Sequence, residues 1–461
     1  MIRKSFRFVA LAAAVAMSAS LFAGCGSKTE TPKDTTQTQK EDIKPAKLTW
    51  WTFQRHDMEY MKGLVEKFNK ENKYGITVDY VVQSENFRQS LDLAFQSNQA
   101  PDIYTGQDLA KYYVDKGQAE PLDKWLTPEL KSRYGDRLYS EGDNGVNDKI
   151  YSLPNAGVTY RLVYNKDLFA KAGLTEAPKT MDQLVEYAKK ITEAGKADKV
   201  YGFAINLKNT QTAMERSVNV VGQKSGFGYF DYKTGKFDFK PFKPIVTAIK
   251  KIVDDGSMFP GYESLDIDPL RSQFAQGKIG MYFGGSWEPG VYADQFKTDI
   301  NWAAAPVPTL DGTAKGPSFI SSLRWMYISS KTEYKEQAWK VFEYFNTDAV
   351  QIPYQEKGFG NSVVPSVVKA AKKPEMKGME YFLIGNEDAT WPTKPQERTL
   401  KIEGKPFNDV FAMVIMGKAD FDKEIDAVNK KYNDALEAAI KDGTEKDWKK
   451  ADFNPQSLIA K

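Results

Sequence analysis

The sequence predicts an α/β fold built from two lobes. Segments rich in β-forming residues alternate with amphipathic helical segments, a pattern that favours parallel sheets with right-handed helical crossovers. The chain has 461 residues, enough for about two to four ordinary domains or for two large lobes. Because no short repeat and no long polar linker interrupts the body of the sequence, two lobes are favoured over a string of small domains.

The alternation is clearest in the first part of the body. Residues 47–53 (KLTWWTF) and 76–82 (ITVDYVV) are rich in β-branched and aromatic side chains and predict strands. Residues 58–69 and 87–95 repeat apolar side chains at helical spacing and predict the connecting helices. A short third strand is predicted at residues 101–104.

The same elements recur through the rest of the chain. Strands are predicted at residues 162–164 and 279–283, and helices at residues 181–194 and 242–254. The last hundred residues are mostly helical in pattern, as at residues 420–441. The whole body therefore reads as α/β.

The composition excludes several function classes. Without Arg3, Lys4 and Arg7 of an acid-free N-terminal segment, the formal charge falls from +3 to zero, so the chain lacks the basic footprint of a nucleic-acid-binding protein. Its single Cys excludes an intrachain disulfide framework and a Cys-rich zinc site, and its single His leaves little for His-centred catalysis. We expect no catalytic residue, no metal, no cofactor and no nucleic-acid partner.

The N-terminus is predicted to contain a secretion signal and a lipid anchor. Residues 1–24 form a lipoprotein signal peptide, whose apolar part at residues 8–23 is too short for a membrane-spanning helix of about 20 residues. Small residues before Cys25 resemble the lipobox of bacterial lipoproteins, in which the Cys is diacylated, although Phe22 stands where Leu is usual. The alternative is an ordinary secretory signal. Residues 25–44 are polar and predict a flexible tether, so we expect an extracytoplasmic protein anchored by lipid to the outer face of the cell membrane.

Unusual residues follow the predicted strands. Ligands of open α/β sheets bind at the carboxyl ends of strands. Residues 51–55, 106–108, 284–288 and 321–325 occupy such places and combine Trp, Gly, Ser, Arg and Asp. Aromatic residues reach 13% of the chain. A core does not call for this mixture, whereas a cleft that stacks on apolar faces and hydrogen-bonds hydroxyl groups does.

Four stretches, in order, carry a resemblance to a known family. They are LTWWTFQ (48–54), APDIYTGQDLAKYYVDKGQAEPLDKW (100–125), KIYSLPNAGVTYRLVYNKDLFAKAGL (149–174) and FAQGKIGMYFGGSW (274–287) with INWAAAPVPTLDG (300–312) and KEQAWKVFEYF (335–345). Together they resemble the extracellular solute-binding proteins of ABC importers, the broad family that includes maltose-binding protein.

The resemblance implies the two-lobed type II fold of periplasmic binding proteins, with parallel or mixed sheets and a ligand cleft at a multi-strand hinge. The N-terminal lobe would comprise residues 46–156 and 321–375, and the C-terminal lobe residues 157–320 and 376–461. A carbohydrate, expected to be an oligosaccharide, would be held between closing lobes and delivered to the transmembrane subunits of the permease. We expect a monomer.

The ligand contacts that the strand ends and the resemblance indicate are aromatic, amide, hydroxyl and charged side chains. They are Trp51, Gln54, Arg55, Gln107, Asp108, Tyr160, Arg161, Ser286, Trp287, Glu288, Arg324, Trp325 and Trp391.

Several of these contacts have a structural alternative, which for Arg324 and Trp325 is packing at the hinge. Trp287 is expected to stack on a sugar ring, but could be a core residue at a strand end. Asp108 is expected to accept hydrogen bonds from sugar hydroxyls, but could be the N-cap of the next helix. Maltose-binding proteins use an acid near the first strand that crosses between the lobes. Val158 replaces that acid here, which argues against maltodextrin itself and leaves Tyr160 as the contact.

Three arginines raise the question of ligand charge. Arg55, Arg161 and Arg324 would lie near the cleft if the resemblance holds, and this motivates the hypothesis of an acidic, uronate-containing glycan. A neutral plant-polysaccharide fragment is equally admissible. Arg55 could instead be a solvated surface residue, and Arg161 could pair with an acid on the other lobe.

Other functions compete with sugar transport. A glycoside hydrolase would need two carboxylates about 5–9.5 Å apart across a scissile bond, which a sequence does not reveal. The oxygen-rich segment at residues 141–148 does not have EF-hand spacing, so we interpret it as a turn and not as a calcium site. A binding protein for a non-sugar solute is the remaining alternative.

Overall fold

The computed structural model of the chain describes residues 43–83, 86–135, 138–324, 326–395, 397 and 400–459, with the backbone alone for residues 322–324. All of these residues belong to one compact unit. The predicted signal peptide and Cys25 lie outside the described residues. Within the described part, no helix is both long enough and apolar enough to cross a bilayer.

A four-stranded sheet organises what we call the first lobe. Its order is β13-β3-β1-β2, with β1 parallel to both β2 and β3, and β13 antiparallel to β3. The strands are β1 (Ala46–Thr52), β2 (Ile76–Val82), β3 (Ile103–Tyr104) and β13 (Tyr327–Ile328). The helices that share its core are α1 (Met58–Glu71), α2 (Phe87–Gln96), α3 (Ala110–Asp115), α4 (Pro128–Tyr134), α12 (Lys335–Phe345), α13 (Asp348–Glu356) and α14 (Pro365–Ala370). A small hairpin joins β4 (Gly145–Val146) to β5 (Lys149–Ile150).

Alternation along β1 sets the core of the first lobe. Trp50 is fully buried and meets the ring edges of Tyr80 and Phe345 at centroid distances of 5.0 and 4.9 Å. Trp51, the next residue, points to the opposite face and is only partly buried. The helix and strand that the sequence predicts on either side of β1 therefore pack as the hydrophobic pattern requires.

A seven-stranded sheet joins the first lobe to what we call the second lobe. Its order is β15-β12-β6-β10-β7, with β11 and β14 also paired to β6. The strands are β6 (Pro154–Asn165), β7 (Tyr201–Phe203), β10 (Ile279–Gly285), β11 (Trp302–Pro306), β12 (Ser318–Arg324), β14 (Asn361–Ser362) and β15 (Asp388–Ala389). Because its strands run in both directions, the sheet is mixed, and the predicted α/β class is confirmed.

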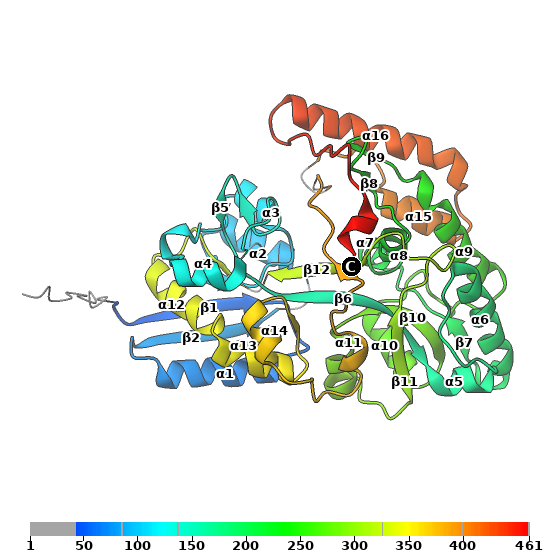
Figure 1. The fold of residues 1–461 in the computed structure, drawn as a ribbon, viewed down its shortest axis with the longest axis horizontal. Coiled ribbons are helices and arrows are strands. Elements are labelled where there is room, and N and C mark those ends of the chain that lie inside the picture. The colour runs from blue at the N-terminus through cyan, green and yellow to red at the C-terminus, as the bar shows by residue number, and fades with distance from the viewer. Residues whose placement is uncertain are drawn as a thin grey trace, which may run out of the picture. The chain divides into compact units, whose positions relative to one another are not determined.

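Strand β6 is far longer than its sequence suggests. Its first half pairs with β12 and β14, and its second half pairs with β10 and β11 (Figure 1). The local pattern predicts a strand only at residues 162–164, because the Pro-Asn-Ala-Gly segment at residues 154–157 has low β propensity, whereas the resemblance also implies a strand that crosses between the lobes near residues 155–159. Partners on both sides satisfy its backbone groups, so tertiary pairing overrides the local preference.

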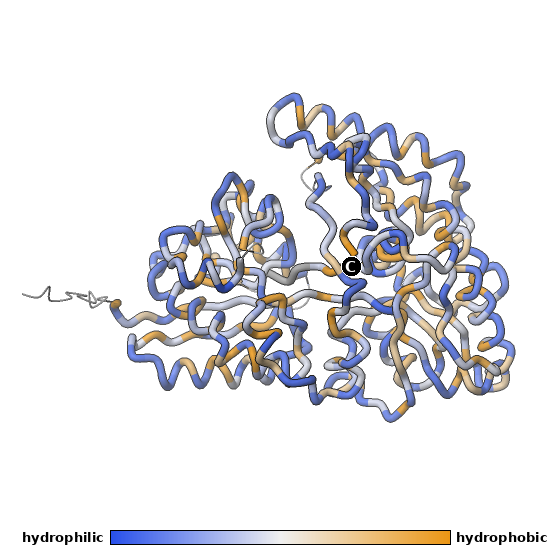
Figure 2. Tube along the Cα trace, in the orientation of Figure 1, coloured by the Kyte–Doolittle hydropathy of each residue, from blue (hydrophilic) through white to orange (hydrophobic). Residues whose placement is uncertain are grey.

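The second lobe is mostly helical outside the sheet. Its helices are α5 (Lys166–Lys171), α6 (Met181–Ala194), α7 (Thr210–Met214), α8 (Val220–Lys224), α9 (Lys243–Asp254), α10 (Ile267–Ala275), α11 (Glu288–Gly290), α15 (Phe407–Ile415) and α16 (Phe421–Lys441), and its hairpin joins β8 (Phe230–Asp231) to β9 (Lys236–Phe237). Helix α6 begins where Thr180 accepts a hydrogen bond from the Gln183 amide, and Gly202 lets β7 approach it, because a Cβ there would lie 1.9 Å from the Ala188 carbonyl oxygen. Figure 2 shows hydrophilic and hydrophobic residues alternating along α16, as expected of a helix with one buried face.

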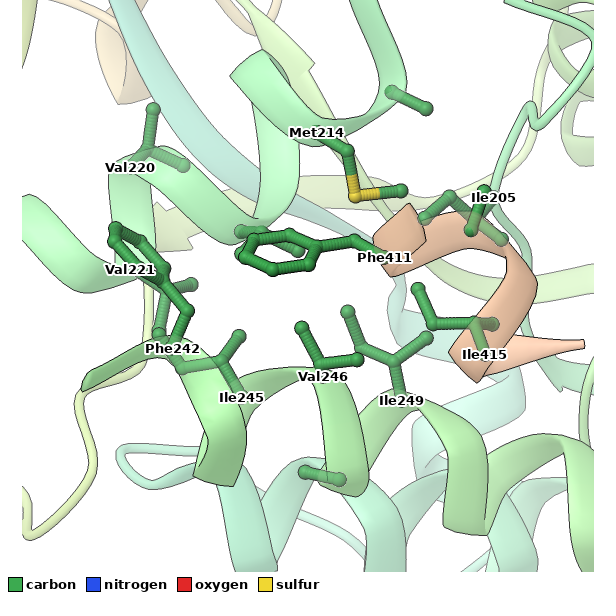
Figure 3. Close-up of a cluster of buried hydrophobic side chains, with 14 of the residues drawn as sticks. Ile205, Met214, Val220, Val221, Phe242, Ile245, Val246, Ile249, Phe411 and Ile415 are labelled. Carbon is green, nitrogen blue, oxygen red and sulfur yellow. The ribbon is translucent and has the colours of Figure 1, made fainter. Parts of the chain in front are cut away.

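Phe411 of α15 lies at the centre of a large apolar core. It is fully buried, and Figure 3 shows it between α9 below and Met214 above. The rings of Phe407, Phe421 and Phe242 lie 5.6, 5.8 and 5.9 Å from its own, centroid to centroid. This cluster holds α15 against α7, α8 and α9.

A buried ion pair fixes the strand at the edge of the mixed sheet. The Arg161 guanidinium donates to both carboxylate oxygens of Asp388, at 2.8 and 2.7 Å. The same side chain donates to the carbonyl oxygens of Tyr381 and Leu383. Arg161 of β6 therefore pins the segment that leads into β15.

We expect Phe411→Ala to lower the free energy of unfolding by about 3–5 kcal/mol, because the cavity left in this core is not refilled. Urea unfolding followed by Trp fluorescence measures the change. Leu93→Ala is the control, since Leu93 is 63% exposed on α2, and its effect should stay within about 0.5 kcal/mol. Equal losses for the two variants would contradict this assignment of the core.

Arg161→Met should destabilise the protein by about 3–5 kcal/mol, since it leaves the Asp388 carboxylate buried without its cation. The double variant Arg161→Met/Asp388→Asn should recover part of that loss, because the stranded charge is gone. Thermal and urea unfolding of the wild type and the three variants form a double-mutant cycle. A double variant no more stable than Arg161→Met would contradict the role given to the pair.

Candidate functional site

A cavity of about 770 Å³ lies between the first and second lobes. The first lobe contributes the segment after β3 and the turn before β4, while β6 and β12 contribute side chains from the strands that link the lobes. The second lobe contributes α7, α8, the hairpin at β8, the segment that contains β15, and the start of α15. Its volume suits a ligand of several ring units more than a single ion.

Aromatic rings line much of the cavity. Tyr160 of β6 and Phe319 of β12 lie side by side across the two strands, with nearly parallel rings whose centroids are 6.1 Å apart. The other rings at the lining are Tyr139, Tyr229, Tyr232, Trp391 and Phe407. Such rings offer flat apolar faces with polar edges.

A row of polar side chains comes from one helical segment. Residues 210–224 run through α7, a π-helical turn at Glu215–Asn219 and α8 without interruption. The polar side chains that this segment places at the lining lie four residues apart: Gln211, Glu215, Asn219 and Gln223. Since positions four apart share a helix face, the rest of the segment can face the core of the second lobe, where Val218 and Val221 are buried.

Most acids at the lining have a cation partner. Asp108 is held by Arg88, with nitrogen to oxygen distances of 2.5 and 3.1 Å, and Asp388 by Arg161. Glu397 accepts from the Lys394 ammonium at 3.0 Å. These pairs neutralise three of the carboxylates without any ligand.

Glu215 is the exception among the acids whose contacts can be followed. It accepts a hydrogen bond from the Gln211 amide at 3.1 Å, and no described Lys or Arg lies within ion-pair distance of it. By surface area Glu215 is an exposed residue, and it lies at the cavity lining. Desolvation by the surrounding protein raises the pKa of Glu215, and the negative charge of Glu397 raises it further.

Some buried polar atoms on lining residues lack a hydrogen-bond partner among the described residues. Among them are the side-chain oxygens of Gln223 and Asn408 and the indole nitrogen of Trp391. A buried acceptor or donor that has lost water without gaining a partner costs about 1–3 kcal/mol. The cavity therefore presents hydrogen-bonding groups that the protein itself leaves unmet.

Four of the predicted contact residues line the cavity: Gln107, Asp108, Tyr160 and Trp391. The alternative role of Asp108 as a helix N-cap is wrong, because Leu109 occupies the N-cap position of α3 and no side chain caps it. The Asp108 carboxylate is instead held by Arg88, whose place at the site the sequence analysis missed.

Ser286, Trp287 and Glu288 do not line the cavity. Trp287 lies behind Tyr160, edge to face at 5.8 Å, and its indole donates to Glu288 at 2.7 Å. Glu288 is fully buried and forms an ion pair with Arg271 at 2.7 Å. Trp287, held by Glu288, thus packs against the Tyr160 ring without lining the cavity itself.

The predicted contacts after β1 and on β6 also lie elsewhere. Trp51, Gln54 and Arg55 are absent from the lining, and Arg55 forms an ion pair with Asp268 of α10 at 2.8 Å, so it is not simply a solvated side chain. Arg161 is outside the lining as well and pairs with an acid, Asp388. Trp325 and the side chain of Arg324 lie outside the described residues.

Several lining residues escaped the sequence analysis. The polar row of α7 and α8 carries a signal, since Gln211, Glu215, Asn219 and Gln223 recur every four residues, but the same spacing is typical of a solvated helix face. Asn408 carries none, because a lone Asn beside Phe407 at the start of a helix has no distinctive pattern.

The sequence and the fold match one family. Residues 54–352 match the family described as bacterial extracellular solute-binding protein, which is more than half of the chain. The galactooligosaccharide-binding protein of Bacillus subtilis is 26% identical over 439 residues, covering 90% of this chain and 93% of that protein. The sn-glycerol-3-phosphate-binding periplasmic protein UgpB of Brucella melitensis is 26% identical over 431 residues, covering 85% and 93%.

Solved structures agree on the fold. The GacH receptor of Streptomyces glaucescens, determined unliganded and with acarbose, superposes with a TM-score of 0.70 at 21% identity and covers 85% of this chain and 99% of its own. The expected two-lobed type II binding-protein fold is thereby confirmed. On the strength of the family match, this chain belongs to the bacterial extracellular solute-binding proteins.

Proposed function

We propose that this protein captures a carbohydrate, an oligosaccharide, in the cavity between its lobes and delivers it to the permease subunits of an ABC importer. The observation that carries the proposal is the lining of that cavity, where aromatic rings stand beside neutral amide side chains. Pyranose rings have apolar C–H faces that pack on aromatic rings, and hydroxyl groups that pair with amides. Relatives include a protein named for galactooligosaccharide binding, which agrees with this chemistry.

The size of the cavity supports an oligosaccharide over a single sugar ring. Its volume of about 770 Å³ lies in the upper part of the range typical of small-molecule sites. Trp391 stands in the wall formed by the second lobe, and Tyr160 stands on β6 between the lobes. Rings on two different walls can contact successive sugar units.

We further propose that binding occurs without catalysis. The family consists of binding proteins, and closing lobes around a ligand would bias an open–closed equilibrium by contacts made only in the closed form. The proposed lobe boundaries remain residues 46–156 with 321–375 and residues 157–320 with 376–461. A lipid on Cys25 would hold a monomeric binding protein beside its permease at the outer face of the membrane.

A thermal-shift screen of residues 26–461 against neutral oligosaccharides, among them galactotriose, maltotriose, xylotriose and raffinose, should yield at least one stabilising sugar. A ligand at 100 times its dissociation constant adds about 2.7 kcal/mol to the stability of the folded state, which is easily seen. Chromatography of the sugar afterwards should show it intact. Stabilisation by none of the carbohydrates would contradict the carbohydrate proposal, and cleavage would contradict binding without catalysis.

Trp391→Ala should weaken the sugar found in that screen about tenfold or more in calorimetry, since the ring that covers the sugar face is lost; tenfold is about 1.4 kcal/mol. Trp125→Ala is the matched control. Trp125 stacks on Trp339 at 5.3 Å in the first lobe and is absent from the cavity lining, so its removal should leave the affinity unchanged. Equal effects of the two variants would argue against the cavity as the sugar site.

A further inference from the structure

The charge of the lining distinguishes classes of ligand that the relatives leave open. One relative is named for a neutral oligosaccharide and another for a phosphate ester. The acids of the cavity are Asp108, Asp143, Glu215, Asp388 and Glu397, whereas Lys394 is the basic side chain among the described lining residues. The wall is therefore acidic, which opposes the hypothesis of an acidic glycan.

Of the three arginines that motivated an acidic glycan, Arg55 and Arg161 do not line the cavity, and the side chain of Arg324 lies outside the described residues. Arg55 pairs with Asp268, and Arg161 is consumed by Asp388. Arg88, which the sequence analysis did not single out, is paired with Asp108. A ligand carboxylate would have to displace a resident acid to reach either of the last two guanidinium groups.

Glu215 adds a negative charge to the lining that no described Lys or Arg balances in an ion pair. The three other acids with resolved ion pairs are balanced by Arg88, Arg161 and Lys394. Glu215 instead has the neutral Gln211 as its hydrogen-bond donor, and Lys394 and Arg216 act on it only at longer range. An anion bound near α7 would meet this carboxylate at close range, where like charges repel.

The buried amide oxygens also favour an uncharged ligand, for a different reason. Gln223 is 6% exposed and Asn408 5% exposed; both residues line the cavity, and the side-chain oxygen of each is buried without a donor among the described residues. Each therefore calls for an O–H or N–H group on the ligand. Sugar hydroxyls donate as well as accept, so they also satisfy the Trp391 indole, whereas carboxylate and phosphate oxygens only accept.

We propose that Glu215, together with the acceptor oxygens of Gln223 and Asn408, is the determinant of charge selectivity, so that the cavity takes an uncharged oligosaccharide and excludes ligands that carry a carboxylate or a phosphate. This inference rests on the proposed function and narrows it. Repulsion from Glu215 rejects the anion, and the unmet acceptors on α8 and α15 reward the hydroxyl groups that replace it.

Calorimetry on the mature chain tests the charge rule directly. The neutral probes are galactotriose, maltotriose and xylotriose, and the anionic probes are trigalacturonate, glucuronosyl-xylotriose and glycerol 3-phosphate. The best neutral sugar should bind at least tenfold more tightly than every anionic probe. Glu215→Gln should reduce that ratio about tenfold by relieving repulsion of the anions. Glu186→Gln, which removes an acid paired with Lys190 on α6 outside the lining, should leave the ratio as it is.

The pH dependence supplies a second readout. Desolvation and the nearby charge of Glu397 raise the pKa of Glu215, while Lys394 and Arg216 oppose that shift, so its charge is lost at a higher pH than that of an unperturbed Glu. The affinity for trigalacturonate should therefore increase as the pH falls toward that pKa, and Glu215→Gln should flatten the increase. A wild-type profile that Glu215→Gln leaves intact would overturn the assignment to Glu215.

Gln223→Met separates the acceptor argument from a folding defect. Met has a similar shape and no acceptor that needs a donor, so the unliganded protein should be as stable as the wild type or more so. Its affinity for the best neutral sugar should nevertheless fall about tenfold. Unchanged affinity would overturn the role of Gln223.

The outcomes separate this inference from the function on which it rests. Tightest binding by an anionic sugar would overturn the charge rule and leave the carbohydrate proposal intact. Tightest binding by glycerol 3-phosphate, or binding by no sugar of either kind, would overturn both.

Discussion

The site depends on one strand that belongs to both lobes. Strand β6 pairs with β12 and β14 along its first half and with β10 and β11 along its second. Because successive side chains point to opposite faces, Tyr160 lines the cavity while Arg161 points away from it and holds the segment before β15. A slip of one residue would exchange these roles, so the register of β6 sets both the lining and its support.

Three arginines near the cavity form ion pairs within the protein and are therefore already engaged before a ligand binds. Arg161 with Asp388, Arg88 with Asp108 and Arg271 with Glu288 each form a close ion pair. Breaking such a pair when it is buried strands a charge at considerable cost, so these cations are poorly available to an anionic ligand. Arginines close to the cavity thus coexist with an acidic lining.

Unmet hydrogen-bonding groups at the lining are the basis of the specificity that we propose. The oxygens of Gln223 and Asn408 and the indole nitrogen of Trp391 have given up water without finding partners among the described residues. These unpaired groups slightly lower the stability of the unliganded protein. A ligand whose hydroxyl groups form hydrogen bonds with them removes that cost. A ligand without matching hydroxyl groups leaves these polar groups unpaired. This cost discriminates between ligands more strongly than a loss of apolar contact would.

The sequence by itself determined the α/β class, the main helices and strands, and the family to which the chain belongs. Periodicity is a local property, so Trp50 could be placed in the core and helix α6 could be recognised from its apolar spacing. Of the predicted contacts, four reach the lining: Gln107 and Asp108 follow β3, Tyr160 lies within β6, and Trp391 lies in a Pro-bounded loop.

Only the tertiary structure decided which charged side chains face the cavity. Whether a charged side chain meets a ligand depends on its ion-pair partner, and no local pattern reveals which residue that is. The pairs here are Arg55 with Asp268, Arg161 with Asp388 and Glu288 with Arg271. The row at Gln211, Glu215, Asn219 and Gln223 shows the same limit. Its spacing is visible in the sequence. Whether that face of the helix meets bulk water or a cavity depends on where the first lobe lies relative to it.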